Sequence, residues 1–403
     1  MNPRCASVLT TPAAAAPPPD IERLRDDFPA LRQHFGGRPL VYLDNAATTH
    51  RPTVVLDTLD RFYRRDNANI HRGVHRLSVR ATEAYEGARA TVARFLNAAR
   101  AEEIVFVRGA TEAINLVAHS FARPRLRDGD EILVSELEHH ANIVPWQLVG
   151  AQTGARLRVV PITDAGELRM DAYERLLTER TRLVALTHAS NALGTLNPVR
   201  EIVARAHAHG VPVLLDGAQA VAHVPVDVRA LDCDFYAACG HKWLCGPQGT
   251  GFLYIRRDRL PALAPTFVGW GSTARYDLEE QIFEPWDDGR RFEFGTRPWP
   301  LYPALKVASQ RIQALDPAAI TATIAPMVAR LKDELTQIRG VTLHTPRAAD
   351  LSAGLVTISH SGPPDLGQRL WQEHRILVSH NPDRRWMRLS INAYVLPEEL
   401  SYG

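Results

Sequence analysis

Short apolar runs of strand length alternate with amphipathic stretches of helical spacing between about residues 100 and 255. The predicted strands are EEIVFVRG, EILVSE, RLRVVPI, RLVALTHA, VPVLLDGA, CDFYAACG and GFLYIRR. Intervening segments such as TEAINLVAHSFA and NPVREIVARAHAHG have apolar residues at helical spacing, and the second ends on glycine. Buried strands that alternate with helices predict an α/β fold, with a parallel or mixed sheet covered on both faces.

The pattern changes in the last hundred residues. The long helical stretches PALKVASQRIQAL and PAAITATIAPMVARLKDELTQIRG precede three predicted strands, GVTLHT, AGLVTISH and RWMRLSIN. This order is typical of a smaller α+β unit. We therefore predict a large domain over 37–304 and a small domain formed by 21–36 with 305–403. Residues 1–20, rich in Ala and Pro, are expected to be a disordered tail.

Composition narrows the class of protein. The 403 residues include 47 Lys and Arg against 45 Asp and Glu, without a long basic block, so a nucleic-acid-binding protein is not indicated. There is no run of 18 apolar residues and no signal-peptide pattern, so we expect a cytoplasmic protein without membrane contact. Four cysteines are too few for a disulfide framework, and no Cys/His spacing suggests a metal site.

Only three lysines stand among those 47 basic residues, and this scarcity directs attention to each of them. Lys306 and Lys332 lie in helical stretches and are expected to be ordinary surface residues. Lys242 lies in a glycine-bounded turn between two predicted strands, in AACGHKWLCGPQGTGFLY. Lysine can form a Schiff base and arginine cannot, so Lys242 is the candidate for covalent chemistry.

Two further strand ends accompany this turn, at the edge where open α/β sheets carry their active residues. Asp216 ends the strand in VLLDGAQA, and Thr111 begins a helix whose free N–H groups favour an anion such as phosphate. A lysine, a strand-end carboxylate and such a helix start are what pyridoxal phosphate (PLP) requires. Each alone has an ordinary explanation, as a solvated lysine, a capping Asp or an N-cap Thr. Together they favour PLP.

The sequence resembles the class V, fold-type I PLP enzymes, and among them the SufS-type (group II) cysteine desulfurases. The resemblance extends from about Phe28 to Glu399. Its most specific stretches are YLDNAATTHRP, NANIHRGVHRLSVRAT, RGATEAINLVA, ELEHHANIVPWQ, HASNALGTLNP, DGAQA, GHK and FEFGT. It implies a large mixed-sheet PLP-binding domain, a smaller α+β domain and a homodimer whose active sites are shared between subunits.

The resemblance also implies roles for individual residues. Lys242 would hold PLP, Asp216 would pair with the pyridinium nitrogen, and His139 would stack on the ring and take part in catalysis. The remaining cofactor contacts would be Gln219 and Asn191 at the phenolic oxygen, and Thr111, His241, Cys239 and the partner's Thr296 at the phosphate. Arg388 would bind the carboxylate of an amino-acid substrate. Substrate contacts from Asn191, His71 and Arg72 are also expected, although the last two could instead pack at the dimer interface.

Four departures from the family pattern bear on function. Group II desulfurases carry a nucleophilic cysteine, in a stretch like RTGHHC, where this chain has the shorter RILVSHNPDRRWMRLS without cysteine. Cys239 stands where relatives have serine or threonine, and Cys245 lies in a turn that is one residue longer than in typical desulfurases. That longer turn is closer to isopenicillin N epimerase-like and cysteine-conjugate lyase branches. Relatives also continue beyond PEELSYG into a further helix, which leaves open a differently capped small domain or a shortened chain.

The leading hypothesis is a PLP-dependent lyase that cleaves the C–S bond of cysteine or a cysteine S-conjugate without a protein persulfide. An amino-acid epimerase, aminotransferase or decarboxylase of a biosynthetic pathway remains an alternative, because Arg388 suits any α-carboxylate. A true cysteine desulfurase that uses another thiol, such as Cys245, and a catalytically silent scaffold are the remaining alternatives.

Overall fold

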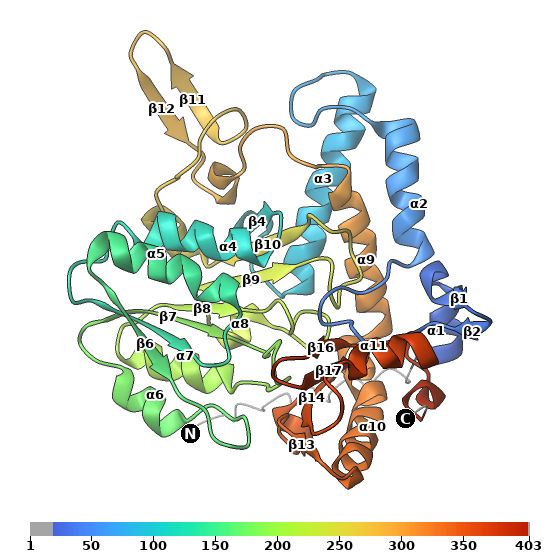
Figure 1. Cartoon of the computed structure of the whole chain (residues 1–403). Coiled ribbons are helices and arrows are strands. Elements are labelled where there is room, and N and C mark those ends of the chain that lie inside the picture. Colours follow the sequence, from blue (N-terminus) through green and yellow to red (C-terminus); the bar gives the residue numbers. More distant parts are fainter. Residues whose placement is uncertain (1–18, 402–403) are drawn as a thin grey trace, which may run out of the picture.

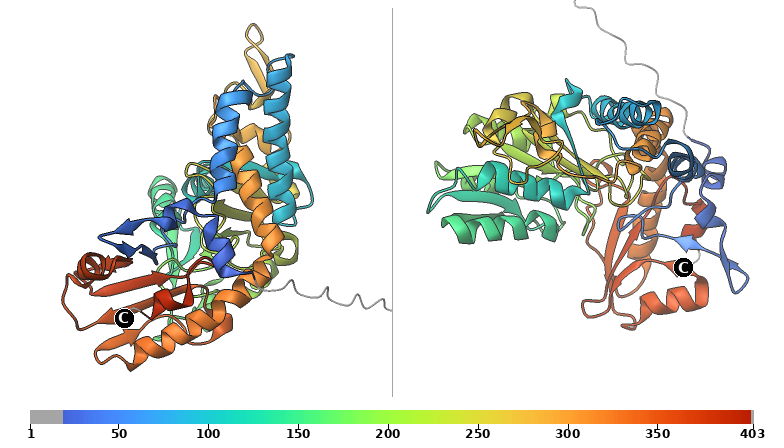
Figure 2. Two further views of the ribbon diagram at one scale, coloured as in Figure 1. Left: turned by 90° about the vertical axis from the view of Figure 1, so that its right-hand side faces the viewer. Right: turned by 90° about the horizontal axis from the view of Figure 1, so that it is seen from above.

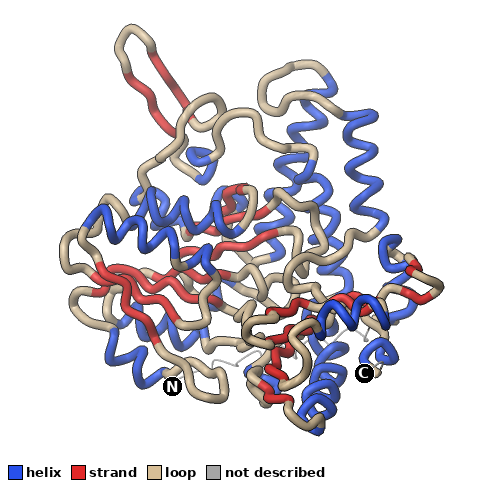
Figure 3. Tube along the Cα trace, in the orientation of Figure 1, coloured by secondary structure: helices blue, strands red, loops and turns tan. Residues whose placement is uncertain are grey.

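A seven-stranded mixed sheet forms the centre of the computed structural model, which describes residues 19–401 (Figure 1, Figure 3). The predicted tail therefore lies almost entirely outside the described residues. The strand order is β4-β10-β9-β8-β7-β5-β6. The strands are β4 (Ile104–Val107), β5 (Glu131–Ser135), β6 (Arg156–Val160), β7 (Thr181–Thr187), β8 (Val213–Asp216), β9 (Phe235–Cys239) and β10 (Gly251–Ile255). Each lies in a segment predicted from its apolar run, and the α/β prediction is confirmed.

One strand of this sheet runs against the others. β10 pairs antiparallel with both β4 and β9, whereas β9, β8, β7, β5 and β6 pair in parallel. The carboxyl ends of β4, β5, β7, β8 and β9 therefore meet at one edge of the sheet. Segments that follow these ends are the ones that converge on a ligand in open α/β sheets.

Helices cover both faces of the sheet, and successive side chains of each strand alternate between the two cores. Leu183 and Leu214 face one core with α4 (Ala110–Val117) and α5 (Val144–Thr153). Val184 and Leu215 face the other, which includes α7 (Val199–Ala208). The shorter helices α6 (Met170–Leu176) and α8 (Val228–Leu231) belong to this second core.

Three helices, α2 (Thr53–Arg61), α3 (Arg76–Phe95) and α9 (Leu301–Leu315), pack together beside the sheet, and a fourth, α10 (Pro317–Gln337), follows them in the chain. α9 packs against α2 and α3, as the left view of Figure 2 shows. α10 lies at an angle of 70° to α9. Within residues 19–401 no single helix meets the length and hydropathy needed to cross a membrane; α9 and α10 pass this test only as a bent pair.

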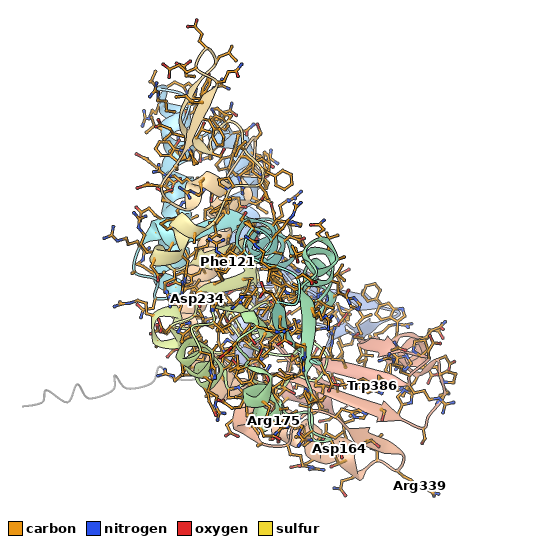
Figure 4. The ribbon with its side chains drawn as sticks, turned by 90° about the vertical axis from the view of Figure 1, so that its left-hand side faces the viewer. Phe121, Asp164, Arg175, Asp234, Arg339 and Trp386 are labelled. Atoms are coloured by element: carbon orange, nitrogen blue, oxygen red, sulfur yellow. The ribbon has the colours of Figure 1, made fainter. Side chains whose placement is uncertain are left out.

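A second, antiparallel sheet of four strands lies against α10, in the order β13-β14-β17-β16. These strands are β13 (Val341–Leu343), β14 (Leu355–His360), β16 (Ser379–Asn381) and β17 (Trp386–Ser390). Figure 4 labels Trp386 on this sheet. α1 (Ile21–Asp26) and the parallel pair of β3 (Val41–Tyr42) with β15 (Ile376–Leu377) lie nearby, as does α11 (Leu366–Arg369). The smaller α+β unit is therefore present; its exact limits stay a prediction.

Two short hairpins complete the chain, β1 (His34–Phe35) with β2 (Arg38–Pro39), and β11 (Thr273–Asp277) with β12 (Ile282–Pro285). The β11–β12 hairpin projects beyond the large sheet (Figure 1).

Lys332 corrects one prediction. It is not a surface residue: it is 3% exposed, and its Nζ donates to the Pro346 carbonyl (2.7 Å) and to Ser352 Oγ (2.5 Å). Burial lowers its pKa to about 8. Lys306 is half-buried on α9.

Candidate active site

A cavity of about 920 Å³ lies at the edge where the parallel strands end. This is near the upper end of the volumes typical of small-molecule sites. Nine of the sequence-predicted site residues line it: Thr111, His139, Asn191, Asp216, Gln219, Cys239, His241, Lys242 and Arg388. They come from segments that follow β4, β5, β7, β8 and β9, and from β17 of the small sheet. The large sheet and the small sheet therefore both contribute to one cavity.

Asp216 is the last residue of β8 and is buried. Burial raises the pKa of its carboxyl, and the opposing effects are a hydrogen bond from the Ala218 N–H to Oδ1 (2.9 Å) and the charges of Lys242 and His139. No donor is paired with Oδ2 among the described residues. A buried carboxylate with a free acceptor oxygen suits a protonated ring nitrogen.

Gln219 and His139 are both oriented by their own hydrogen bonds. The Gln219 side chain donates to the Ala46 carbonyl (2.9 Å) and accepts from Trp243 Nε1 (2.7 Å), so one amide hydrogen remains. His139 Nδ1 accepts from the Ala141 N–H (3.1 Å). Burial, followed by the charge of Lys242, lowers the pKa of His139 and favours a neutral ring.

Glu138 is a buried residue that the sequence interpretation missed, although it lies within the ELEHHANI stretch. Its carboxylate accepts from Ser135 Oγ (2.5 Å), Asn142 Nδ2 (2.6 Å) and the Thr187 N–H (3.0 Å). Burial raises its pKa to about 7. These bonds tie the segment after β5, which carries His139, to the end of β7.

The helix start at Thr111 and the turn at His241 also line the cavity. Thr111 is exposed in the first turn of α4, and its neighbour Glu112 accepts from the backbone N–H of Arg108 (2.6 Å). The pKa of His241 is lowered to about 4, first by burial and then by Lys242 and Arg51. Cys239 is buried, and burial raises the pKa of its thiol. A thiol is a weaker hydrogen-bond donor than a hydroxyl.

Arg388 extends from β17 into the cavity lining and is held on two sides. Its Nη2 donates to Asp44 Oδ1 (3.0 Å), and its Nη1 donates to the Asn191 carbonyl (2.9 Å). Its buried Nε has no hydrogen-bond partner among residues 19–401. Asp44 was not singled out from the sequence, although it belongs to the YLDNAATTHRP stretch.

Three predicted site residues do not line the cavity of their own chain. Thr296 is exposed outside it. His71 forms an ion pair with Glu86 (2.9 Å), and the Arg72 guanidinium lies 5.6 Å from the centre of the Trp270 ring. Their predicted contacts with cofactor or substrate would need a second subunit, and they stay predictions.

The cysteines occupy different environments. Cys239 is the one cysteine of the described chain that lines the cavity. Cys245 is buried in the turn after Lys242 with a positive φ of 55°, and its Sγ lies 3.6 Å from the Trp243 carbonyl. β16 and β17 are joined directly by residues 382–385, which contain no cysteine, and Asn381 pairs with Trp386. Cys5 lies outside the described residues.

These residues fit PLP. The cavity combines a lysine, a buried carboxylate with an unpaired oxygen, a helix start and an arginine whose Nε lacks a partner. The lysine, the carboxylate and the helix start suit an electron-sink cofactor with a ring nitrogen and a phosphate. The arginine suits the carboxylate of a small substrate.

The chain is similar to cysteine desulfurases in both sequence and architecture. The chain is 47% identical over 357 residues to a cysteine desulfurase of Synechococcus elongatus, which covers 88% of this chain and 56% of the relative's length. It superposes with a TM-score of 0.88 on an apo cysteine desulfurase of Thermococcus onnurineus, at 32% identity over 96% of both chains.

It also superposes on the cystine C–S lyase C-DES in complex with cysteine persulfide, its reaction product, at a TM-score of 0.81. Identity there is 28% over 90% of this chain and 95% of C-DES. Another C-DES structure has glycine covalently linked to its PLP cofactor. The family model for aminotransferase class V matches residues 41–380. This match and the shared architecture show that the chain belongs to the PLP-dependent aminotransferase class-V family.

Proposed function

We propose that this protein uses PLP to cleave the C–S bond of cysteine or a cysteine S-conjugate, without a persulfide on its own chain. The observation that carries the proposal is the cavity itself, which combines Lys242, Asp216 and Arg388, together with the short turn at 382–385, which contains no cysteine. Among the described cysteines, only Cys239 reaches it, and its thiol is buried with a raised pKa. A thiol of raised pKa is a poor nucleophile.

Each cavity residue then has a defined task. When bound, PLP supplies an electron sink for the electrons released at the substrate Cα. Lys242 would hold the cofactor covalently and, once released, move the proton at Cα. Arg388 would bind the α-carboxylate, and Asp216 would keep the ring nitrogen protonated.

The net reaction balances without a protein thiol. Cysteine and one water give pyruvate, ammonia and hydrogen sulfide: the C–S bond breaks, the sulfur leaves with a proton, and water replaces the amino group. A desulfurase would instead give alanine and a persulfide, which requires an acceptor thiol. The similarity to C-DES supports the first route, because that protein is a C–S lyase.

The test compares products from cysteine, cystine and several S-conjugates with the PLP-loaded enzyme. Pyruvate and sulfide are expected, and Lys242→Ala should abolish both the bound-cofactor absorbance band and the activity. Alanine with a persulfide that disappears in Cys239→Ser would establish a desulfurase that uses another thiol. Proton exchange at Cα in heavy water without any sulfur release would favour the epimerase, aminotransferase or decarboxylase alternative.

We also propose that two copies of the chain form a homodimer with shared active sites. Phe267 is 67% exposed and still lines the cavity, so the cavity opens onto a surface that an apolar partner would cover. Thr296 is exposed beside this region and would then reach the partner's phosphate site. The cytoplasmic location inferred from the sequence stays a prediction.

A further inference from the structure

The loop that carries Asn191 is bound by β14 and by the segments on either side of it. The Thr357 hydroxyl donates to the Ala192 carbonyl (2.5 Å), and the Thr345 hydroxyl donates to the Leu193 carbonyl (2.6 Å). The Ala353 N–H donates to the Gly194 carbonyl (2.9 Å). Three successive carbonyls of a loop between two elements of the large sheet unit are thus bound by the small unit.

Arg388 belongs to the same arrangement. The carbonyl of Asn191, the residue before Ala192, accepts from Arg388 Nη1 (2.9 Å). The predicted substrate-carboxylate arginine and the loop of the predicted cofactor asparagine are therefore directly connected.

Thr357 pairs with Arg388 and contacts the Asn191 loop in this arrangement. In the antiparallel pair of β14 with β17, Thr357 stands directly opposite Arg388, so their side chains project from the same face of the small sheet. Thr357 is 2% exposed, and its own N–H donates to Thr345 Oγ1 (2.8 Å). Its hydroxyl therefore lies on the face of the small sheet from which Arg388 projects, and it donates to the carbonyl of Ala192, the residue after Asn191.

We propose that Thr357 is a positioning residue that holds Arg388 and the Asn191 loop as one unit. This inference rests on the proposed function, in which Arg388 binds the substrate carboxylate and Asn191 contacts the cofactor. Loss of the hydroxyl leaves the Ala192 carbonyl without this donor and frees the loop to move relative to β17. A displacement of about 1 Å in a substrate-positioning group is enough to cost a large factor in binding or rate.

The test uses the PLP-loaded enzyme and L-alanine, a probe with an α-carboxylate and no sulfur to release. Its dissociation constant is measured from the change in the bound-cofactor absorbance, and the pH midpoint of that band is measured without probe. Thr357→Val keeps the shape and removes the donor; Thr357→Ser keeps the donor. Thr323→Val is the matched control, because the Thr323 hydroxyl bonds to Ala319 within α10.

We expect Thr357→Val to weaken L-alanine binding about tenfold, because the carboxylate site is misplaced, and to shift the pH midpoint of the band, because the Asn191 loop moves relative to the cofactor. Thr357→Ser and Thr323→Val should stay within about twofold of wild type in both readouts. Thr357→Ala provides a second donor-free variant if the valine variant does not fold. Wild-type values in a folded Thr357→Val or Thr357→Ala would overturn the inference. A wild-type protein that takes up no PLP, or that shows no reaction with any sulfur substrate, would instead contradict the proposed function.

Discussion

The three lysines of this chain have three different environments. Lys242 lines the cavity, Lys306 is half-buried on α9, and Lys332 is buried in the small unit. Within residues 19–401, no carboxylate is hydrogen-bonded to Lys332; its partners are the Pro346 carbonyl and Ser352 Oγ. An ammonium group held only by neutral acceptors in a buried site is costly to keep charged.

Lys332 therefore makes the stability of the fold depend on pH. Its folded-state pKa is lowered to about 8, by burial first and by Arg347 second, from about 10.4 in an unfolded chain. Between these values the unfolded state binds more protons, so this group makes stability rise with pH, by at most about 1.4 kcal/mol per pH unit.

Urea unfolding of wild type and Lys332→Met at pH 7, 8, 9 and 10 measures the effect. Above pH 8, the unfolding free energy of wild type should rise relative to that of Lys332→Met. A constant difference across this range would contradict the assigned pKa. Lys306→Met is the control, and its difference from wild type should not change with pH in this way.

Lys242, Asp216 and Thr111 were predicted to lie near one another because the carboxyl ends of parallel strands converge, and all three line the cavity. Their roles toward the cofactor stay predictions. Lys332 and Asp44 were missed for a common reason. Their partners, near residue 350 and at Arg388, are brought to them only by the tertiary fold, and helical or strand periodicity contains no information about such contacts.

At the scale of elements, the strands of the large sheet were predictable because each is buried on both faces and is a continuous apolar run. β11 and β12 were not predicted: they consist mostly of exposed residues in a projecting hairpin, where no apolar run or strict alternation marks a strand. The position of the Asn191 loop on β14 was equally hidden, because it depends on a close approach between distant segments.

Gly194 makes this close approach possible. Its φ is +77°, and a Cβ there would lie 2.6 Å from the Leu355 carbonyl oxygen of β14. Gly194→Ala must therefore strain the backbone and also push the loop away from β14, at a cost of about 1–3 kcal/mol or more.

Gly210 is a matched control, because it has a similar φ of +71° and no atom within 4 Å of its would-be Cβ. Thermal or urea unfolding should show a larger loss for Gly194→Ala than for Gly210→Ala. Only the first should also weaken L-alanine binding, since only that loop carries Asn191. If Gly194→Ala and Gly210→Ala lost the same amount of stability and of L-alanine affinity, the close contact of the loop with β14 would not matter for either property.

At the scale of the whole molecule, exposed apolar residues gather in the segment that leads from the cavity into the projecting hairpin. Phe267 lines the cavity, and the β11–β12 hairpin that follows it in the chain exposes Tyr276, Ile282 and Phe283. Exposed apolar residues gathered in one segment suit an interaction site. A second copy of the chain that covers it would close the cavity and bring its own Thr296 near.

This arrangement predicts the behaviour of two charge substitutions. The double variant Phe267→Glu with Phe283→Glu places two carboxylates on the surface that the second copy would bury, and the cost of burying unpaired charge should shift the protein to a monomer. Light scattering coupled to gel filtration should give about 45 kDa for this variant and twice that mass for wild type. C–S cleavage should fall at least tenfold, because each monomer then lacks the groups supplied by its partner.

Ile338→Glu is the control: Ile338 is also half exposed, but it adjoins Arg339, which Figure 4 shows far from the hairpin. A double variant that remains a dimer, or a fully active monomer, would show that the site is complete within one chain.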